Sequence, residues 1–154
     1  MRLKLGVMAA VVASTTLLIG MTTASGQSVV HLVAPEEGLV TKFVDLGHNG
    51  LRLGDRVAFR GPLLNASKTE RVGTAYGECL VHRRIVDAET GLYNCTYVLE
   101  LAEGDIMVKG LDPRGPSVAE FAVFGGTGAY AGASGEATFT DTEGETDMVL
   151  RLEG

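Results

Sequence analysis

Two cysteines and two tyrosines are the side chains of this sequence best suited to chemistry. Cys79 and Cys95 fall on two β-rich segments, Arg71–Arg84 and Leu92–Leu101, which one hairpin turn at Asp87–Gly91 joins. Because side chains alternate along a strand, both cysteines are expected on the same face of the sheet. In an exported protein the preferred interpretation is a cross-strand disulfide, and the alternative is a free, catalytic thiol at Cys79.

The tyrosines Tyr93 and Tyr97 share the parity of Cys95 and therefore point to the same side. One interpretation makes them core aromatics whose hydroxyls are satisfied by neighbours. The other makes them groups of a cavity that hydrogen-bond a carbonyl or a phenol. The sequence leaves both interpretations open.

Two carboxylates, Glu36 and Glu37, follow Pro35 in an expected turn. They form either a solvated turn or a general acid at the mouth of a cavity, where burial raises the pKa of a carboxyl group. The three histidines share no spacing and the sequence has no C-x-x-C pair, so no metal site is predicted; they are His31, His48 and His82.

The first 26 residues have the pattern of a secretory signal peptide. Basic Arg2 and Lys4 precede an apolar run, Leu5–Ile19, and small or polar residues continue to Gly26. We therefore expect cleavage, secretion, and one domain over residues 27–154; a retained N-terminal anchor is the alternative. The run is short for a membrane span, so no stable membrane insertion is expected after cleavage.

The charge of the chain is acidic. The formal net charge of the 154 residues is −6, and loss of Arg2 and Lys4 with the leader makes it more negative. An acidic domain lacks the basic surface that nucleic acids require, so nucleic-acid binding is excluded. The acidic residues are scattered along the sequence, which favours a role in solubility rather than in binding a cationic partner.

The remaining sequence consists of short alternating runs with no convincing helix. The segment Arg71–Arg84 has very small residues on one face, which make room inside a closed sheet. This patterning predicts an all-β barrel or sandwich of about eight strands. The expected strands include Ser28–Ala34, Leu39–Leu46, Arg56–Arg60, Arg71–Arg84, Leu92–Leu101, Phe121–Phe124 and Asp147–Leu152, with turns at Gly47–Gly50 and Asp87–Gly91 and a loop at Asp112–Pro116.

The glycine-rich stretch Phe121–Phe139 contains a G-x-G-x-x-A match beginning at Gly126. A dinucleotide site needs a helix directly after such a motif. Gly132, Gly135 and a β-rich run follow instead, so no helix is expected. The stretch is better interpreted as a tight corner between two strands.

Two of these segments resemble a known superfamily. Arg71–Cys79 (RVGTAYGEC) resembles the RVG-x-x-x-G-x-C strand of the plant allene oxide cyclases. Phe121–Gly135 resembles the glycine corner shared by the allene oxide cyclase and dirigent proteins. The resemblance extends over about Val57–Phe139 in the same order and spacing.

The resemblance implies an eight-stranded antiparallel β-barrel with a central hydrophobic cavity, often a homotrimer. Its members cyclise a reactive lipid epoxide or steer the coupling of phenoxy radicals. Cys79 matches the cavity cysteine of the cyclases, whereas His31–Ala34 offers no carboxylate at the place of their catalytic glutamate.

We therefore expect an exported barrel that binds a small hydrophobic or phenolic ligand and steers its cyclisation or coupling without a cofactor. Cys79, Tyr93 and Tyr97 are the expected ligand-binding residues, and Glu36 and Glu37 are the candidates for catalysis. The alternative is a non-catalytic binding or structural barrel protein.

Overall fold

A computed structural model describes residues 26–47, 52–83, 91–113 and 118–153. Several expected features therefore fall wholly or partly outside the described residues. They are the leader up to residue 25, the greater part of the turn at 47–50, the hairpin turn at 87–90, and the part of the 112–116 loop from residue 114 onward.

The described chain forms nine strands and one short 3₁₀ turn. The strands are β1 (Ser28–Pro35), β2 (Val40–Val44), β3 (Arg56–Asn65), β4 (Arg71–Arg83), β5 (Leu92–Leu101), β6 (Gly104–Pro113), β7 (Val118–Gly126), β8 (Ser134–Thr142) and β9 (Glu145–Glu153). No helix in the described part of the chain is long and apolar enough to cross a membrane.

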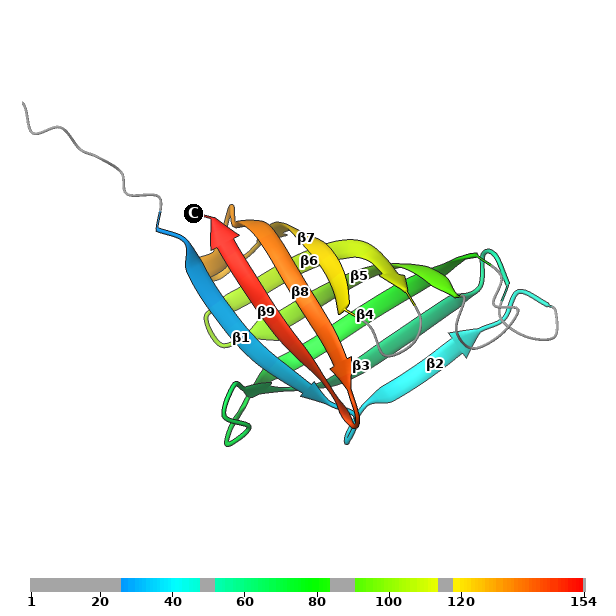
Figure 1. The fold of residues 1–154 in the computed structure, drawn as a ribbon, viewed down its shortest axis with the longest axis horizontal. Helices are drawn as coiled ribbons and strands as arrows, with labels where there is room; N and C mark the ends of the chain where they lie inside the picture. The colour runs from blue at the N-terminus through cyan, green and yellow to red at the C-terminus, as the bar shows by residue number, and fades with distance from the viewer. Residues whose placement is uncertain (1–25, 48–51, 84–90, 114–117, 154) are drawn as a thin grey trace, which may run out of the picture.

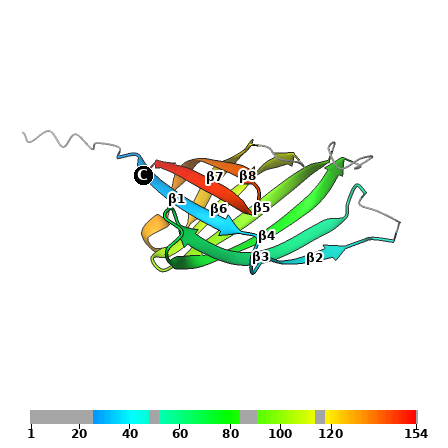
Figure 2. The same cartoon turned by 60° about the horizontal axis from the view of Figure 1, so that its bottom comes forward.

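Eight of the strands close into an antiparallel barrel. Its order is β1-β9-β8-β7-β6-β5-β4-β3, and β1 returns to pair with β3 through Leu32 and Val33. β2 is an extra strand that pairs with Arg56–Arg60 of β3, on the edge of β3 that β1 contacts farther along at Leu64 and Asn65 (Figures 1 and 2). The predicted eight-stranded antiparallel barrel is therefore confirmed.

The barrel forms because alternate side chains of each strand are apolar. In β9, Met148, Leu150 and Leu152 are buried, as the alternation predicted. In β7, Ala119, Phe121 and Val123 are buried while the residues between them are exposed. Because the side-chain period of a strand is two, this pattern fixes which face of each strand lines the interior.

The small residues of β4 point inward as predicted, since Ala75, Cys79 and Val81 are all buried. Gly77 lies directly opposite Phe59 of β3. A Cβ atom at Gly77 would collide with the ring of Phe59. The bare backbone of β4 thus provides the space in which an aromatic ring lies inside the barrel.

The glycine-rich stretch forms the corner between β7 and β8, as predicted. It contains one 3₁₀ turn, Gly128–Tyr130, where no helix was expected. The turn forms because Gly128 has a positive φ of 57° and lies against the carbonyl of Glu103, where a side chain would collide. Three residues are too few for the helix of a dinucleotide site, and the next strand follows at once.

Large buried side chains fill one end of the barrel. Leu99 and Ile106 pair across β5 and β6 beside the turn that joins these strands, and both are fully buried. Leu63 and Leu150 are equally buried. Space remains at the opposite end.

Candidate functional site

The open end of the barrel contains a cavity of about 630 Å³. It lies where β1, β6 and β8 end and where β9 begins, and Thr41 of the extra strand β2 and Leu39, just before that strand, also border it. Apolar side chains form most of the wall; they include Ala34, Val57, Phe59, Ala75, Ala119, Phe139 and Met148. The cavity is therefore a mainly hydrophobic binding space of the size that small ligands occupy.

Aromatic rings meet at Tyr97 on one side of this cavity. The ring centre of Tyr97 lies 5.3 Å from that of Phe59 and 5.1 Å from that of Phe139. Phe121 packs behind it, with 5.2 Å between the ring centres of Tyr97 and Phe121. These edge-to-face and tilted contacts hold Tyr97, which is 6% exposed, in one orientation.

Tyr97 and Asp112 form a polar pair at this wall. The Tyr97 hydroxyl donates a hydrogen bond of 3.1 Å to Oδ2 of Asp112 on the neighbouring strand β6. Burial, and then the negative charge of Asp112, raise the pKa of Tyr97 well above its ordinary value. Tyr97 is therefore a neutral hydrogen-bond donor throughout the physiological range.

The pKa of Asp112 is also raised. Burial is the largest cause, the charge of Asp141 adds to it, and the hydrogen bond from Tyr97 acts in the opposite direction. A carboxyl group whose pKa is shifted towards neutral pH can accept and return a proton, as a general acid or base does. Asp112 thus has both the position and the electrostatic environment of a proton-transfer group.

Cys79 and Cys95 are joined by a disulfide, which confirms the preferred interpretation. They lie directly opposite each other in the β4–β5 pair, with their Cα atoms 4.0 Å apart. Both cysteines of the chain are therefore bonded, and Cys79 has no thiol for catalysis. Sγ of Cys95 lies 3.8 Å from Oδ2 of Asp112, so the bridge packs beside the carboxyl group.

One of the three predicted ligand-binding residues borders the cavity. Tyr97 borders it, whereas Cys79 and Tyr93 lie outside the set of residues that line it. Tyr93 is half-buried and packs against the core. Of the two predicted carboxylates, Glu36 borders the cavity and Glu37 does not; both are exposed. A catalytic role for either glutamate stays a prediction.

Carboxylates surround the mouth of the cavity. Besides Asp112, the lining includes Glu36, Asp141, Glu143 and Glu145, and no lysine, arginine or histidine occurs among the described residues that line it. Glu36 and the β8–β9 turn are held together because the Glu36 N–H donates 2.9 Å to the carbonyl of Gly144. This concentration differs from the scattered acid expected from the sequence.

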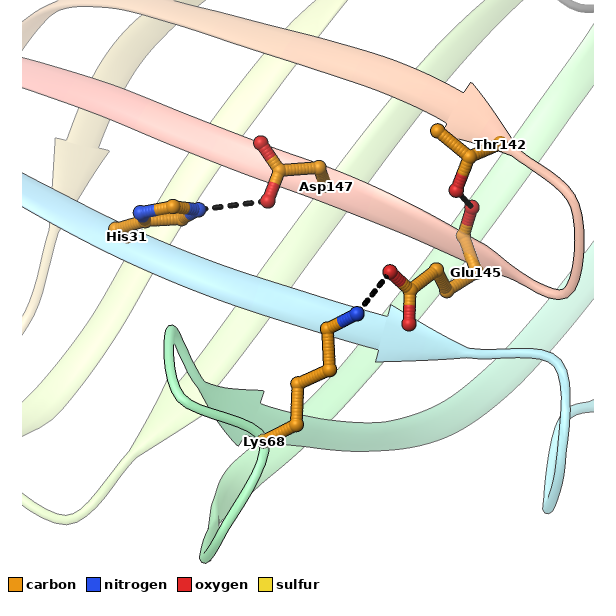
Figure 3. A network of polar contacts seen from close by, with 5 residues as sticks. All are labelled: His31, Lys68, Thr142, Glu145 and Asp147. Atoms are coloured by element: carbon orange, nitrogen blue, oxygen red, sulfur yellow. Dashed lines mark hydrogen bonds and ion pairs between the residues drawn. The ribbon is translucent and has the colours of Figure 1, made fainter.

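Two basic side chains pair with acidic residues of β9, and neither of them lines the cavity. Lys68 reaches from the β3–β4 turn to Glu145 at 2.5 Å, and Nε2 of His31 lies 2.6 Å from Asp147 (Figure 3). His82 is exposed and His48 lies outside the described residues. In the described ranges, no group of histidine, cysteine or acidic side chains is arranged to hold a metal ion.

Asp112 was not predicted as a site residue, because the sequence pattern placed it in the loop expected at Asp112–Pro116. It is the last inward-facing residue of β6, two residues after Gly110 on the same face as Ile106 and Val108. Continuing that alternation by one step would have placed the carboxyl group inside the barrel. Asp141 was missed for a similar reason, since it lies near the end of β8.

The family model for the allene oxide cyclase barrel-like domain matches residues 36–151. The chain belongs to this family. Among solved structures, pyocyanin demethylase has 26% identity and a TM-score of 0.67, covering 81% of this chain and 99% of its own. A comparison with curated proteins found no match.

More distant solved structures share the fold. A pterocarpan synthase dirigent protein has 21% identity and a TM-score of 0.60, covering 84% of this chain and 97% of its own. A Diels–Alderase from Streptomyces koyangensis has 17% identity and a TM-score of 0.60, covering 85% of this chain and 70% of its own. At these identities the likeness establishes the barrel alone.

Proposed function

We propose that this chain binds a small apolar or phenolic aromatic molecule in the open end of its barrel and steers its cyclisation or coupling without a cofactor. The observation that carries the proposal is the cavity of about 630 Å³ in which an aromatic wall adjoins the half-buried carboxyl group of Asp112. A rigid wall of this kind fixes the orientation of a flexible substrate and so lowers the entropic cost of reaction.

Asp112 is the group that we assign to proton transfer. Its carboxylate accepts one hydrogen bond from Tyr97 and retains lone pairs for a hydroxyl or N–H group of a ligand. In the coupling of two phenols, each phenol gives one electron to an external one-electron oxidant and one proton to a base, and one C–C bond forms. Asp112 is placed to take such a proton.

Export from the cytosol is part of the proposal. The disulfide between Cys79 and Cys95 is compatible with an oxidising compartment, in which such bridges persist. The basic and apolar pattern of residues 1–26 supports secretion and cleavage of a leader. Appearance of a shortened chain in the culture medium, with its new N-terminus determined by sequencing, tests this part.

We also infer a homotrimer, which the extra strand β2 supports. Val40 and Val44 point outward from β2 and are 54% and 40% exposed. Among the described strands, β2 pairs with β3 alone, so its other edge offers backbone groups for pairing. Although Lys42 lies between the two valines, an edge strand with exposed apolar side chains is a site for association with another copy.

Binding is tested with 2-naphthol and its methyl ether, 2-methoxynaphthalene, which lacks the donated proton. Ligand fluorescence reports binding cleanly because the chain has no tryptophan. A hydrogen bond to a charged group is worth about 1.5–3 kcal/mol, so 2-naphthol should bind about tenfold more tightly or better. Asp112→Ala should abolish this preference, whereas Asp147→Ala, which removes a carboxylate outside the cavity, should preserve it.

Steering is tested by oxidising bound 2-naphthol with ferricyanide. The product, 1,1′-bi-2-naphthol, has two mirror-image forms, and chiral chromatography measures their ratio. An excess of one form that disappears in Asp112→Ala would support steering. Equal amounts of both forms, with the naphthol still bound, would establish the alternative of a non-catalytic binding protein. Failure of both naphthalenes to bind would overturn the proposal.

A second candidate function is removal of a methyl group. The observation that favours it is the 26% identity to pyocyanin demethylase across nearly the whole of that chain. Incubation of this protein with pyocyanin, followed by mass spectrometry, tests it directly. Loss of the methyl group in the wild type, absent in a boiled sample, would select this function over coupling.

A further inference from the structure

We propose that the ligand of this cavity is a cationic aromatic molecule, with its positive charge delocalised over fused rings. This inference rests on the proposed ligand-binding function and adds the charge of the ligand. It combines the carboxylates at the mouth with the aromatic side chains that line the same cavity, Phe59, Tyr97 and Phe139.

The charge around the cavity is of one sign. Five carboxyl groups line it, and the described lining residues include no basic side chain. Lys68 pairs with Glu145, but no such ion pair is found in the described residues for Glu36, Asp141 or Glu143. A cleft with charges of one sign and low-dielectric walls concentrates ions of the opposite sign.

The carboxylates also act on one another. Asp141 raises the pKa of Asp112 through its charge, which means that the two groups repel when both are ionised. A cation between the mouth and Asp112 would reduce this repulsion, whereas an anionic ligand would increase it. The ligand-free site is therefore better suited to a cation than to a neutral molecule of the same shape.

Two observations favour an organic cation over a metal ion. The acidic side chains of the described residues do not converge into a group that could hold a metal. The wall between them is aromatic, and the ring of Tyr97 contacts those of Phe59 and Phe139. Aromatic faces attract cations, most strongly those that are weakly hydrated, as delocalised cations are.

The experiment compares three fluorescent tricyclic probes at pH 8: the cation N-methylacridinium, the neutral 9-anthracenemethanol and the anion anthracene-9-carboxylate. We expect the cation to bind at least about tenfold more tightly than the neutral probe, and the anion more weakly than either. The advantage of the cation should decrease as salt is raised, because salt screens the exposed carboxylates at the mouth.

The residues responsible are tested by the triple variant Glu36→Gln, Asp141→Asn and Glu143→Gln. It should reduce the affinity for N-methylacridinium several-fold and leave 9-anthracenemethanol binding unchanged, which also shows that the cavity is intact. The matched control changes three carboxylates outside the cavity by the same charge, through Glu120→Gln, Glu136→Gln and Glu153→Gln. It should retain the preference for the cation.

The outcomes separate this inference from the proposed function. Binding of all three probes with similar affinity, or equal losses in the triple variant and its control, would overturn the inference and leave the binding function standing. Binding of none of them would overturn both.

Discussion

The hydroxyl of Tyr97 donates a 3.1 Å hydrogen bond to Oδ2 of Asp112 across the β5–β6 pair, inside the cavity. The pair joins the aromatic wall to the acidic mouth. Tyr97 is fixed by Phe59, Phe121 and Phe139, so the position of the Asp112 carboxylate depends on aromatic packing. This relationship leads to the first two predictions.

Tyr97→Phe should raise the pKa of Asp112 further, because the hydrogen bond from Tyr97 lowers that pKa at present. It should also destabilise the protein by about 1 kcal/mol, the usual net value of such a bond. The titration of the Asp112 carboxyl carbon, followed by NMR in both proteins, measures the shift. An unchanged or lowered pKa would show that the hydroxyl does not stabilise the ionised form.

Asp112→Asn should stabilise the protein at pH 8 and have less effect towards pH 4. The pKa of Asp112 is raised in the folded state, so the folded protein holds the proton more tightly than the unfolded chain. Its contribution to stability is therefore present below the unfolded pKa and lost as pH rises through the folded pKa. The difference in Tm between variant and wild type, measured across this range, should grow with pH. A difference that falls with pH would contradict the shift.

Replacement of both cysteines, Cys79→Ala with Cys95→Ala, should lower the free energy of unfolding by about 3 kcal/mol. The bridge closes a loop over a sequence separation of 16 residues, and cross-linking a loop of this size removes entropy from the unfolded chain. Urea unfolding of the variant and of the non-reduced wild type gives the difference. Thiol titration of the unfolded, non-reduced wild type should detect no free thiol.

Gly77→Ala should destabilise the barrel by about 1–3 kcal/mol, the range for overpacked interiors. The added Cβ atom would collide with the ring of Phe59. Combining it with Phe59→Leu, which removes the ring, should recover a large part of the loss. A double-mutant cycle from chemical unfolding measures this coupling. Additive losses would mean that the cost of Gly77→Ala does not come from a collision with the ring of Phe59.

Charges on the outer face of β2 should prevent association. Val40→Lys with Val44→Lys should convert the proposed homotrimer to a monomer, because two lysines added beside Lys42 leave this face of the edge strand without an apolar side chain and oppose pairing with another chain. Val29→Lys provides the control, since Val29 is 62% exposed on a different strand. Light scattering on a sizing column gives the mass of each variant. A wild-type monomer would overturn the inferred trimer.

Much of the fold could be predicted from local sequence. The alternation in β9 placed Met148, Leu150 and Leu152 in the interior, and the parity of Cys79 and Cys95 predicted their disulfide. These predictions succeeded because strand periodicity and pairing of neighbouring strands are short-range properties. The extra strand β2 was predicted as a strand, but its place beside β1 on one edge of β3 depends on the distant β1–β3 pairing.

The candidate site was less predictable. Its carboxylates come from the turn after β1, the ends of β6 and β8, the β8–β9 turn and the start of β9, and barrel closure alone brings them together. No spacing in the sequence relates Glu36 to Asp141, which are more than a hundred residues apart. The aromatic residue Tyr97 was identified because it lies within a regular strand, where parity determines its direction.

The packing of Leu63, Leu99, Ile106 and Leu150 at one end of the barrel has a kinetic consequence. In the described part of the chain, these side chains block that end, so a molecule enters and leaves the cavity by the same acidic mouth. In the coupling that we propose, the two partners would have to enter one after the other. Release of a coupled product, larger than either partner, would set the turnover rate.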